Sequence, residues 1–107
     1  MTKPLVTVTS LEEAKTAEKH DVEIVDIKNP EEGSLGCPSI ETVEKIKDSL
    51  EEDTKVSIAL GDLPHLPGTV GMAVRGAAEF NPDYIKIGIK GSQTQDEVRE
   101  KLREAKR

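Results

Sequence analysis

The chain has 107 residues, which predicts one domain over residues 1–107 that is long enough to bury an apolar core. Its 21 acidic residues outnumber its 15 basic residues, and the formal net charge of −6 argues against a general surface for nucleic acid or anionic membranes. The single cysteine, Cys37, excludes an internal disulfide, and no Cys/His cluster has metal-binding spacing. No apolar run approaches a membrane span and no signal peptide precedes Leu5, so we expect a cytoplasmic protein.

Residues 5–50 alternate two predicted strands with two predicted helices. The β-branched residues of positions 5–9 and the apolar run that begins at Val22 predict the strands. Ser10 and Glu13 have the spacing of a capping box, which predicts that the first helix begins there. Ser39 is a suitable N-cap for the second helix. The apolar residues of that helix recur at helical spacing, namely Ile40, Val43, Ile46 and Leu50.

The sequence from residue 55 onward repeats this alternation. Residues 55–60 predict a third strand, and residues 61–68 hold two prolines and two glycines, which predict an irregular loop with a solvent-facing His65. A third helix is expected from about residue 68 to residue 78, and residues 84–90 alternate isoleucine with lysine and glycine as in a fourth strand. Thr94 and Glu97 form a second capping box. The apolar stripe expected for the last helix consists of Val98, Leu102 and Ala105.

Four strands, each followed by a helix, predict an α/β fold. This alternation favours a parallel sheet with right-handed crossovers, in which functional residues gather at the carboxyl ends of the strands. We therefore expect four parallel strands in sequential order. An antiparallel pair of neighbouring strands would contradict this prediction.

Charged residues lie within the predicted second and fourth strands. Alternation places Asp26 and Lys28 on one face of the second strand, and Lys86 lies in mid-strand two residues before Gly88. Charged groups are rarely buried unless they are paired or take part in chemistry, so we predict a site formed by these residues. The alternative is an ordinary ion pair at a solvated strand end. Asp62, at the start of the 61–68 stretch, is a second candidate acid.

Three segments of the chain resemble the archaeal (5-formylfuran-3-yl)methyl phosphate synthase family. They are residues 26–36 (DIKNPEEGSLG), 59–70 (ALGDLPHLPGTV) and 83–88 (DYIKIG), and they occur in the order and spacing of the family. The resemblance implies a (βα)4 half-barrel of the TIM-barrel type and class I aldolase-like lyase chemistry in methanofuran biosynthesis. Family members condense two molecules of glyceraldehyde 3-phosphate into a phosphorylated furan aldehyde. Because it covers only the N-terminal half of a family member, the chain is a half-barrel homologue or part of a longer protein.

The resemblance also implies roles for individual residues. Lys28 would form the Schiff base, with Asp26 and Lys86 as supporting residues, and this chemistry requires no metal or other cofactor. Lys90 would join the two other lysines in a local basic patch for a phosphorylated aldehyde or ketone substrate. Substrate-binding residues implied by the family are Asn29, Gly33, Ser34, Asp62, Gly88 and Gly91.

Three functions remain open at this point. The chain is a Schiff-base lyase acting as a symmetric assembly, a non-catalytic half-barrel that binds a small phosphorylated metabolite, or a structural interaction protein. Four curved strands leave two open sheet edges, and unpaired edges favour association. Two copies supply the eight strands that close a TIM barrel, so we expect a homodimer in which the fourth strand of one copy pairs with the first strand of the other.

Overall fold

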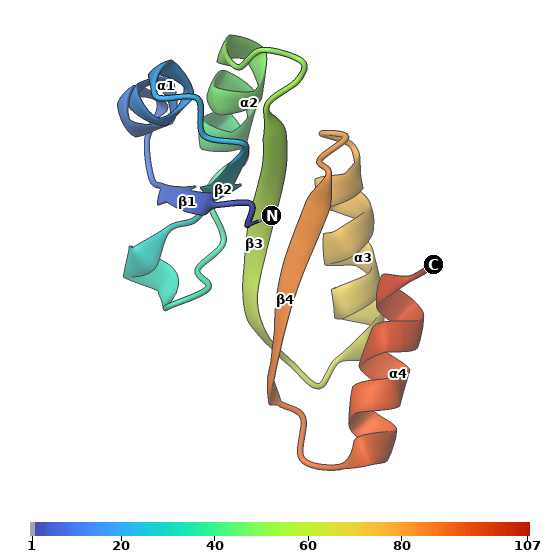
Figure 1. Ribbon diagram of the computed structural model, residues 1–107. Coiled ribbons are helices and arrows are strands. Elements are labelled where there is room, and N and C mark those ends of the chain that lie inside the picture. Colours follow the sequence, from blue (N-terminus) through green and yellow to red (C-terminus); the bar gives the residue numbers. More distant parts are fainter. Residues whose placement is uncertain (1) are drawn as a thin grey trace.

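The computed structural model describes residues 2–107 as a four-stranded parallel sheet whose strands alternate with helices (Figure 1). The strands are β1 (Leu5–Val8), β2 (Ile24–Ile27), β3 (Lys55–Pro64) and β4 (Tyr84–Gly91). The helices are α1 (Leu11–Lys19), the 3-10 helix η1 (Pro30–Glu32), α2 (Ile40–Ser49), α3 (Pro67–Ala78) and α4 (Gln95–Ala105). The spatial order β1-β2-β3-β4, parallel throughout, confirms the predicted α/β fold of the (βα)4 type.

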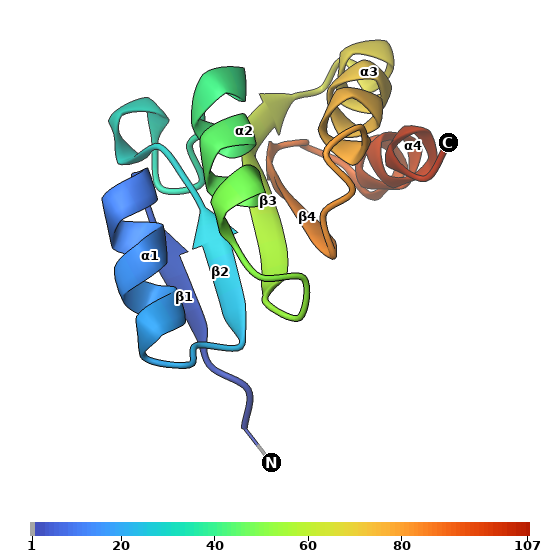
Figure 2. The ribbon, with the colours of Figure 1, turned by 90° about the horizontal axis from the view of Figure 1, so that it is seen from above.

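One face of the sheet carries the apolar core. Successive side chains of a strand point to opposite faces, so residues two apart in the sequence share a face. Figure 2 shows α1 and α2 lying over this side of β1 and β2. The strand residues that belong to the core are Val8, Val25, Ile27, Val56, Ile58 and Leu60, and the helix residues are Ala14, Ala17, Val43, Ile46 and Ala77.

Side-chain hydroxyls cap three of the α-helices at the residues that the sequence predicts. Helix α3 has no side-chain cap and instead begins with Pro67, whose missing N–H needs no partner in the first turn. Within residues 2–107, none of the helices is long and apolar enough to cross a membrane. Each capping hydroxyl accepts a hydrogen bond from a backbone N–H group at 3.1–3.2 Å. The Ser10 hydroxyl accepts from Glu13, that of Ser39 from Thr42, and that of Thr94 from Glu97.

The prediction of a loop over residues 61–68 is wrong for residues 61–64, which extend β3. Between two of its paired positions β3 contains one more residue than β4, which is the pattern of a β-bulge. Gly61 lies in this interval with φ of +92°, a conformation that glycine adopts without a steric penalty. The glycine and proline content therefore marks a bulged strand end here, and the irregular connection to α3 is limited to residues 65–66.

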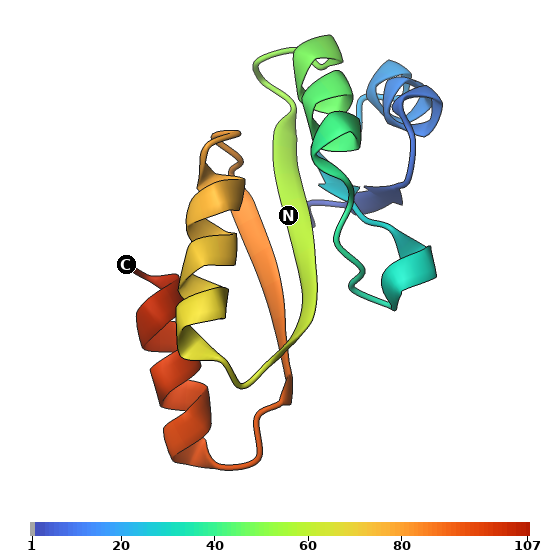
Figure 3. The same ribbon diagram turned by 180° about the vertical axis from the view of Figure 1, so that it is seen from behind.

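The apolar stripe predicted for α4 is wrong at Leu102. That side chain remains 42% exposed, whereas the neighbouring Lys101 is fully buried. Helix α4 packs beside α3 (Figures 1 and 3), and the amine of Lys101 points into the sheet, where it donates to backbone carbonyl groups. These hydrogen bonds stabilise an orientation of α4 that apolar periodicity alone does not give.

Replacing Ile46 with alanine is expected to destabilise the fold far more than the same change at Ile40. Ile46 is fully buried in the core, whereas Ile40, in the same helix, is 68% exposed. Loss of a buried aliphatic side chain costs about 2–5 kcal/mol, so Ile46→Ala should unfold at a clearly lower urea concentration. Ile40→Ala is the matched control, with an expected change of about 0.5 kcal/mol or less. Equal losses in the two variants would contradict the burial seen here.

Candidate functional site

Asp26 lies at the centre of a polar group on the face of the sheet opposite the core. It is fully buried in β2, and its neighbours Val25 and Ile27 both pack into the apolar core. Alternation therefore turns the Asp26 side chain to the other face. Thr7 of β1 and Ser57 of β3 are its register partners, so they share that face. We call this the inner face of the sheet.

Two lysine amines converge on one oxygen of Asp26. Lys86 Nζ lies 3.0 Å from Asp26 Oδ2, and Lys28 Nζ lies 3.6 Å from the same atom. Thr7 Oγ1 donates to this oxygen in a longer contact of 3.4 Å. Asp26, Lys28 and Lys86, which we call the lysine–aspartate cluster, are thus brought together from β2, from the residue just after it and from β4. Both lysine side chains keep part of their surface exposed.

The two oxygens of the Asp26 carboxylate have different surroundings. Oδ2 accepts from the Lys86 amine and the Thr7 hydroxyl, whereas Oδ1 is buried and has no hydrogen-bond partner among residues 2–107. The same holds for Ser57 Oγ, on the paired residue of β3. Because buried polar atoms almost always have partners, two such atoms on adjacent strands favour a position for a bound water or ligand group. Two cations around one carboxylate also give this part of an acidic protein a local excess of positive charge.

The loop after β2 contains three of the predicted substrate-binding residues. Asn29 Oδ1 accepts from the N–H of Glu31 at 3.1 Å and caps η1, so its side chain is engaged within the loop. The loop closes where the Asn29 N–H donates to the carbonyl of Gly36 at 2.8 Å. Gly33 and Ser34 are exposed between these two points. The loop is therefore held in shape by its own hydrogen bonds at the carboxyl end of β2.

Two further predicted residues meet on the inner face. Asp62 and Gly88 are register partners, and a Cβ atom on Gly88 would lie 1.7 Å from Asp62 Oδ1. The Asp62 carboxylate therefore occupies the space above Gly88, which shares a face with Lys86 two residues earlier. Gly91, the last predicted residue, pairs with Pro64 at the end of β4. Asp62 and Gly88 thus lie on the same face as the lysine–aspartate cluster.

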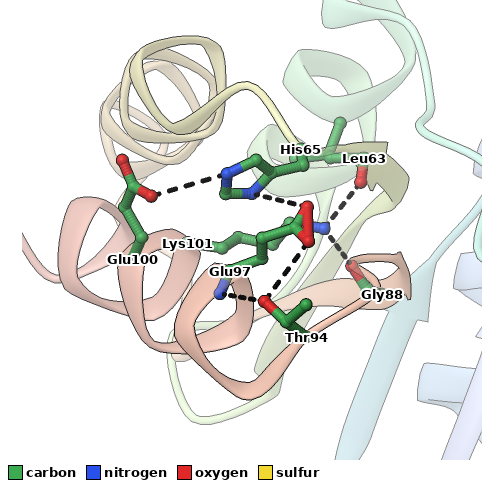
Figure 4. A network of polar contacts seen from close by, with 7 residues as sticks. All are labelled: Leu63, His65, Gly88, Thr94, Glu97, Glu100 and Lys101. Carbon is green, nitrogen blue, oxygen red and sulfur yellow. Dashed lines mark hydrogen bonds and ion pairs between the residues drawn. The ribbon is translucent and has the colours of Figure 1, made fainter.

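Sequence reasoning missed the burial of Lys101 and gave His65 the wrong surroundings. Figure 4 shows both residues in a polar network between the end of β3 and helix α4. His65 Nε2 lies 3.5 Å from Glu100 Oε2, and its Nδ1 lies 4.0 Å from Glu97 Oε1, so the predicted solvent-facing position of His65 is wrong. Apolar spacing gives no signal for Lys101, because Leu102 follows Val98 by four residues, as an apolar stripe requires, and is nevertheless exposed.

The Cys37 thiol packs against the apolar core and not on the inner face. Burial raises the pKa of the Cys37 thiol, and the nearby Glu32 carboxylate raises it further, so the thiol is a weak nucleophile near neutral pH. Cys37 lines an apolar cavity of about 230 Å³ next to Ile40 and Phe80, on the core side of the sheet. Among residues 2–107, no three His, Cys, Asp or Glu side chains form a group that could hold a metal ion.

Lys86→Met is expected to destabilise the fold more than Lys45→Met. Lys86 is the closest cation to the buried carboxylate of Asp26, and removal of one partner leaves that charge poorly compensated. With Lys28 still in place, we expect a loss of about 1–3 kcal/mol in the free energy of unfolding. Lys45 forms an exposed pair with Glu41, which contributes about 0.3–0.5 kcal/mol. An unchanged urea midpoint for Lys86→Met would show that Asp26 does not depend on it.

Comparison with known proteins agrees with the resemblance drawn from the three segments. The chain is 41% identical over 103 residues to the (5-formylfuran-3-yl)methyl phosphate synthase of Methanopyrus kandleri. The aligned segment covers 96% of the chain and 44% of that protein. The proteins of the same name from Methanothermobacter thermautotrophicus and Methanocaldococcus jannaschii are each 42% identical, over 94 and 87 residues. The chain spans less than half the length of these relatives. Since the family model described as 4-HFC-P synthase matches residues 4–107, the chain belongs to the 4-HFC-P synthase family.

Proposed function

We propose that the chain forms a Schiff base with a triose phosphate such as glyceraldehyde 3-phosphate, as the first step of the synthase reaction for which its relatives are named. The convergence of two lysine amines on one oxygen of a fully buried carboxylate is the observation that carries this proposal. Imine formation needs an amine nucleophile beside a group that can donate and accept protons. The lysine–aspartate cluster contains both. Its place in the methanofuran pathway rests on the family.

Lys28 is the better candidate for the nucleophile. Its amine is 3.6 Å from Asp26 Oδ2, whereas Lys86 is at 3.0 Å and is more tightly paired. The Lys28 amine attacks the carbonyl carbon of the aldehyde, the carbonyl electron pair moves to oxygen, and a carbinolamine results. Loss of that oxygen as water then leaves the imine. Lys86 remains as the counter-charge of Asp26 and as a cation for the substrate phosphate.

Asp26 is placed to move the protons of this step. Its Oδ2 atom accepts from the Lys86 amine and forms an ion pair with Lys28, while its Oδ1 atom has no partner among the described residues. A carboxylate with one free oxygen can take a proton from the Lys28 ammonium, which frees the amine for attack, and return that proton to the hydroxyl group of the carbinolamine as it departs as water. The remaining substrate-binding residues of this proposal lie in the loops and strand ends around the cluster, namely Asn29, Gly33, Ser34, Asp62, Gly88 and Gly91.

We also propose that a second copy of the chain closes the sheet. β1 and β4 are the two edges of the sheet, and unpaired backbone groups along an edge favour pairing with another strand. Two copies supply eight strands, as in a TIM barrel, and the relatives are more than twice as long as the chain. Large apolar side chains are exposed on both edge strands, namely Leu5 and Val6 of β1 and Tyr84 and Ile89 of β4.

Incubation with glyceraldehyde 3-phosphate followed by borohydride should add the mass of the reduced adduct to the wild-type chain. Lys28→Ala should lose the adduct, because the nucleophile is gone, while Lys45→Ala, which removes an exposed lysine of α2, should keep it. Intact-mass and peptide mass spectrometry make the measurement. An equal adduct on Lys28→Ala would mean that the labelling is nonspecific. Thermal stabilisation by the same compound without any adduct would favour a binding protein over an enzyme.

Light scattering at micromolar concentration should give twice the chain mass of 11.7 kDa. Ile89→Lys introduces a charge on the β4 edge and should shift the protein towards the monomer. Met72→Lys is the control, because Met72 is also a large exposed apolar residue, more exposed than Ile89, but lies on α3. A stable, folded wild-type monomer would contradict the dimer and the catalytic proposal that depends on a completed barrel.

A further inference from the structure

The end of β3 places Asp62 on the opposite face from the one that regular alternation gives. Leu60 and Leu63 both pack against the apolar core, although residues three apart in a regular strand face opposite sides. An extra residue between them is therefore required, and Gly61, with φ of +92°, provides it. Without the bulge, Asp62 would follow Leu60 by two and point towards the core. With the bulge, it points to the inner face.

Two register shifts that cancel each other enclose Asp62. Between the pair Ala59–Lys86 and the pair Asp62–Gly88, β3 advances by three residues and β4 by two. In the next paired step β3 advances by two residues and β4 by three, so the original register returns. Carbonyl groups inside such an interval cannot all make regular ladder hydrogen bonds. Because buried backbone carbonyls need partners, this interval requires donors from elsewhere in the chain.

Lys101 supplies such a donor (Figure 4). Its amine donates to the carbonyl of Leu63 at 2.7 Å and, in a longer contact, to the carbonyl of Gly88 at 3.4 Å. One carbonyl belongs to β3 and the other to β4, so the amine bridges the two strands inside the irregular interval. No carboxylate within residues 2–107 lies within ion-pair distance of this amine. The two carbonyls are therefore its partners, and they compensate the cost of burying the amine.

Gly88 completes the arrangement on the inner face. The Asp62 carboxylate lies where a side chain at this position would begin, since a Cβ atom would be 1.7 Å from Asp62 Oδ1. Gly61 thus permits the bulge, Lys101 bridges its carbonyls and Gly88 leaves room for the side chain that the bulge redirects. All three features act on the orientation of one carboxylate, which remains exposed.

We propose that Lys101 is a positioning residue that holds the paired bulges of β3 and β4 and so presents the Asp62 carboxylate to the substrate beside the lysine–aspartate cluster. A carboxylate accepts hydrogen bonds from hydroxyl groups and repels phosphate, so Asp62 binds the hydroxyl-bearing part of a sugar phosphate. The identity of that substrate rests on the proposed function. The placement of Asp62 by Lys101 does not depend on it.

NMR of protein labelled with ¹³C in aspartate tests the placement directly. Lys101→Met removes the ammonium and keeps an unbranched side chain, and Gly61→Ala disfavours the bulge by a second route. Both should shift the Asp62 carboxyl resonance and the Gly88 amide resonance. Lys106→Met, which removes an exposed lysine just after α4, should leave both in place. A Lys101→Met variant that is less stable but keeps both resonances would overturn the positioning role.

Two further measurements separate the possible outcomes. In the borohydride assay, Lys101→Met and Asp62→Asn should each raise the triose phosphate concentration for half-maximal labelling about tenfold, the effect of losing one hydrogen bond to a charged group. The adduct at saturation should not change, because Lys28 is intact. If the wild type forms no adduct, the proposed function fails while the NMR result still decides the positioning role. If Lys101→Met does not fold, a crystal structure of the wild type decides it, and an Asp62 side chain turned away from Gly88 would overturn the inference.

Discussion

The charge of Asp26 is the constraint on which the inner face of this sheet depends. A fully buried carboxylate must be neutralised or hydrogen-bonded, and the strand neighbours of Asp26 are apolar residues that point the other way. The compensating amine of Lys86 comes from β4, so it reaches across β3 to β2. The residues of β3 beneath its path, Ser57 and Ala59, are small and fully buried. Larger side chains at these positions would separate the ion pair.

The same constraint gives the cluster its chemical character. The sheet fixes Asp26, while the long side chains of Lys28 and Lys86 approach it from outside and keep part of their surface in solvent. In the proposed Schiff-base step, one amine leaves this carboxylate to attack a carbonyl while the other amine keeps the carboxylate paired.

Local patterns in the sequence are enough to predict most of the fold. Capping hydroxyls and apolar periodicity place the helices. The alternation of side chains along each strand indicates that Asp26, Lys28 and Lys86 share a face of the sheet. The features that could not be predicted depend on partners far away in the chain. Lys101 bonds to a carbonyl 38 residues earlier, and nothing in its own helix signals that carbonyl. The strand character of residues 61–64 likewise depends on pairing with β4, which outweighs their glycine and proline content.

The cancelling register shifts also restrict how this part of the chain can change in length. Each residue added to or removed from one strand alone shifts by one position the pairing of all residues that follow, up to the next turn. Deleting Gly61 would remove the bulge of β3 and leave Asp62 and Leu63 on their present faces, but the extra residue of β4 between Gly88 and Gly91 would then have no counterpart and would misplace the connection to α4. Residues can therefore be lost here only in matched pairs, one from each strand. The lengths of β3 and β4 should vary together among relatives, even where the residues themselves differ.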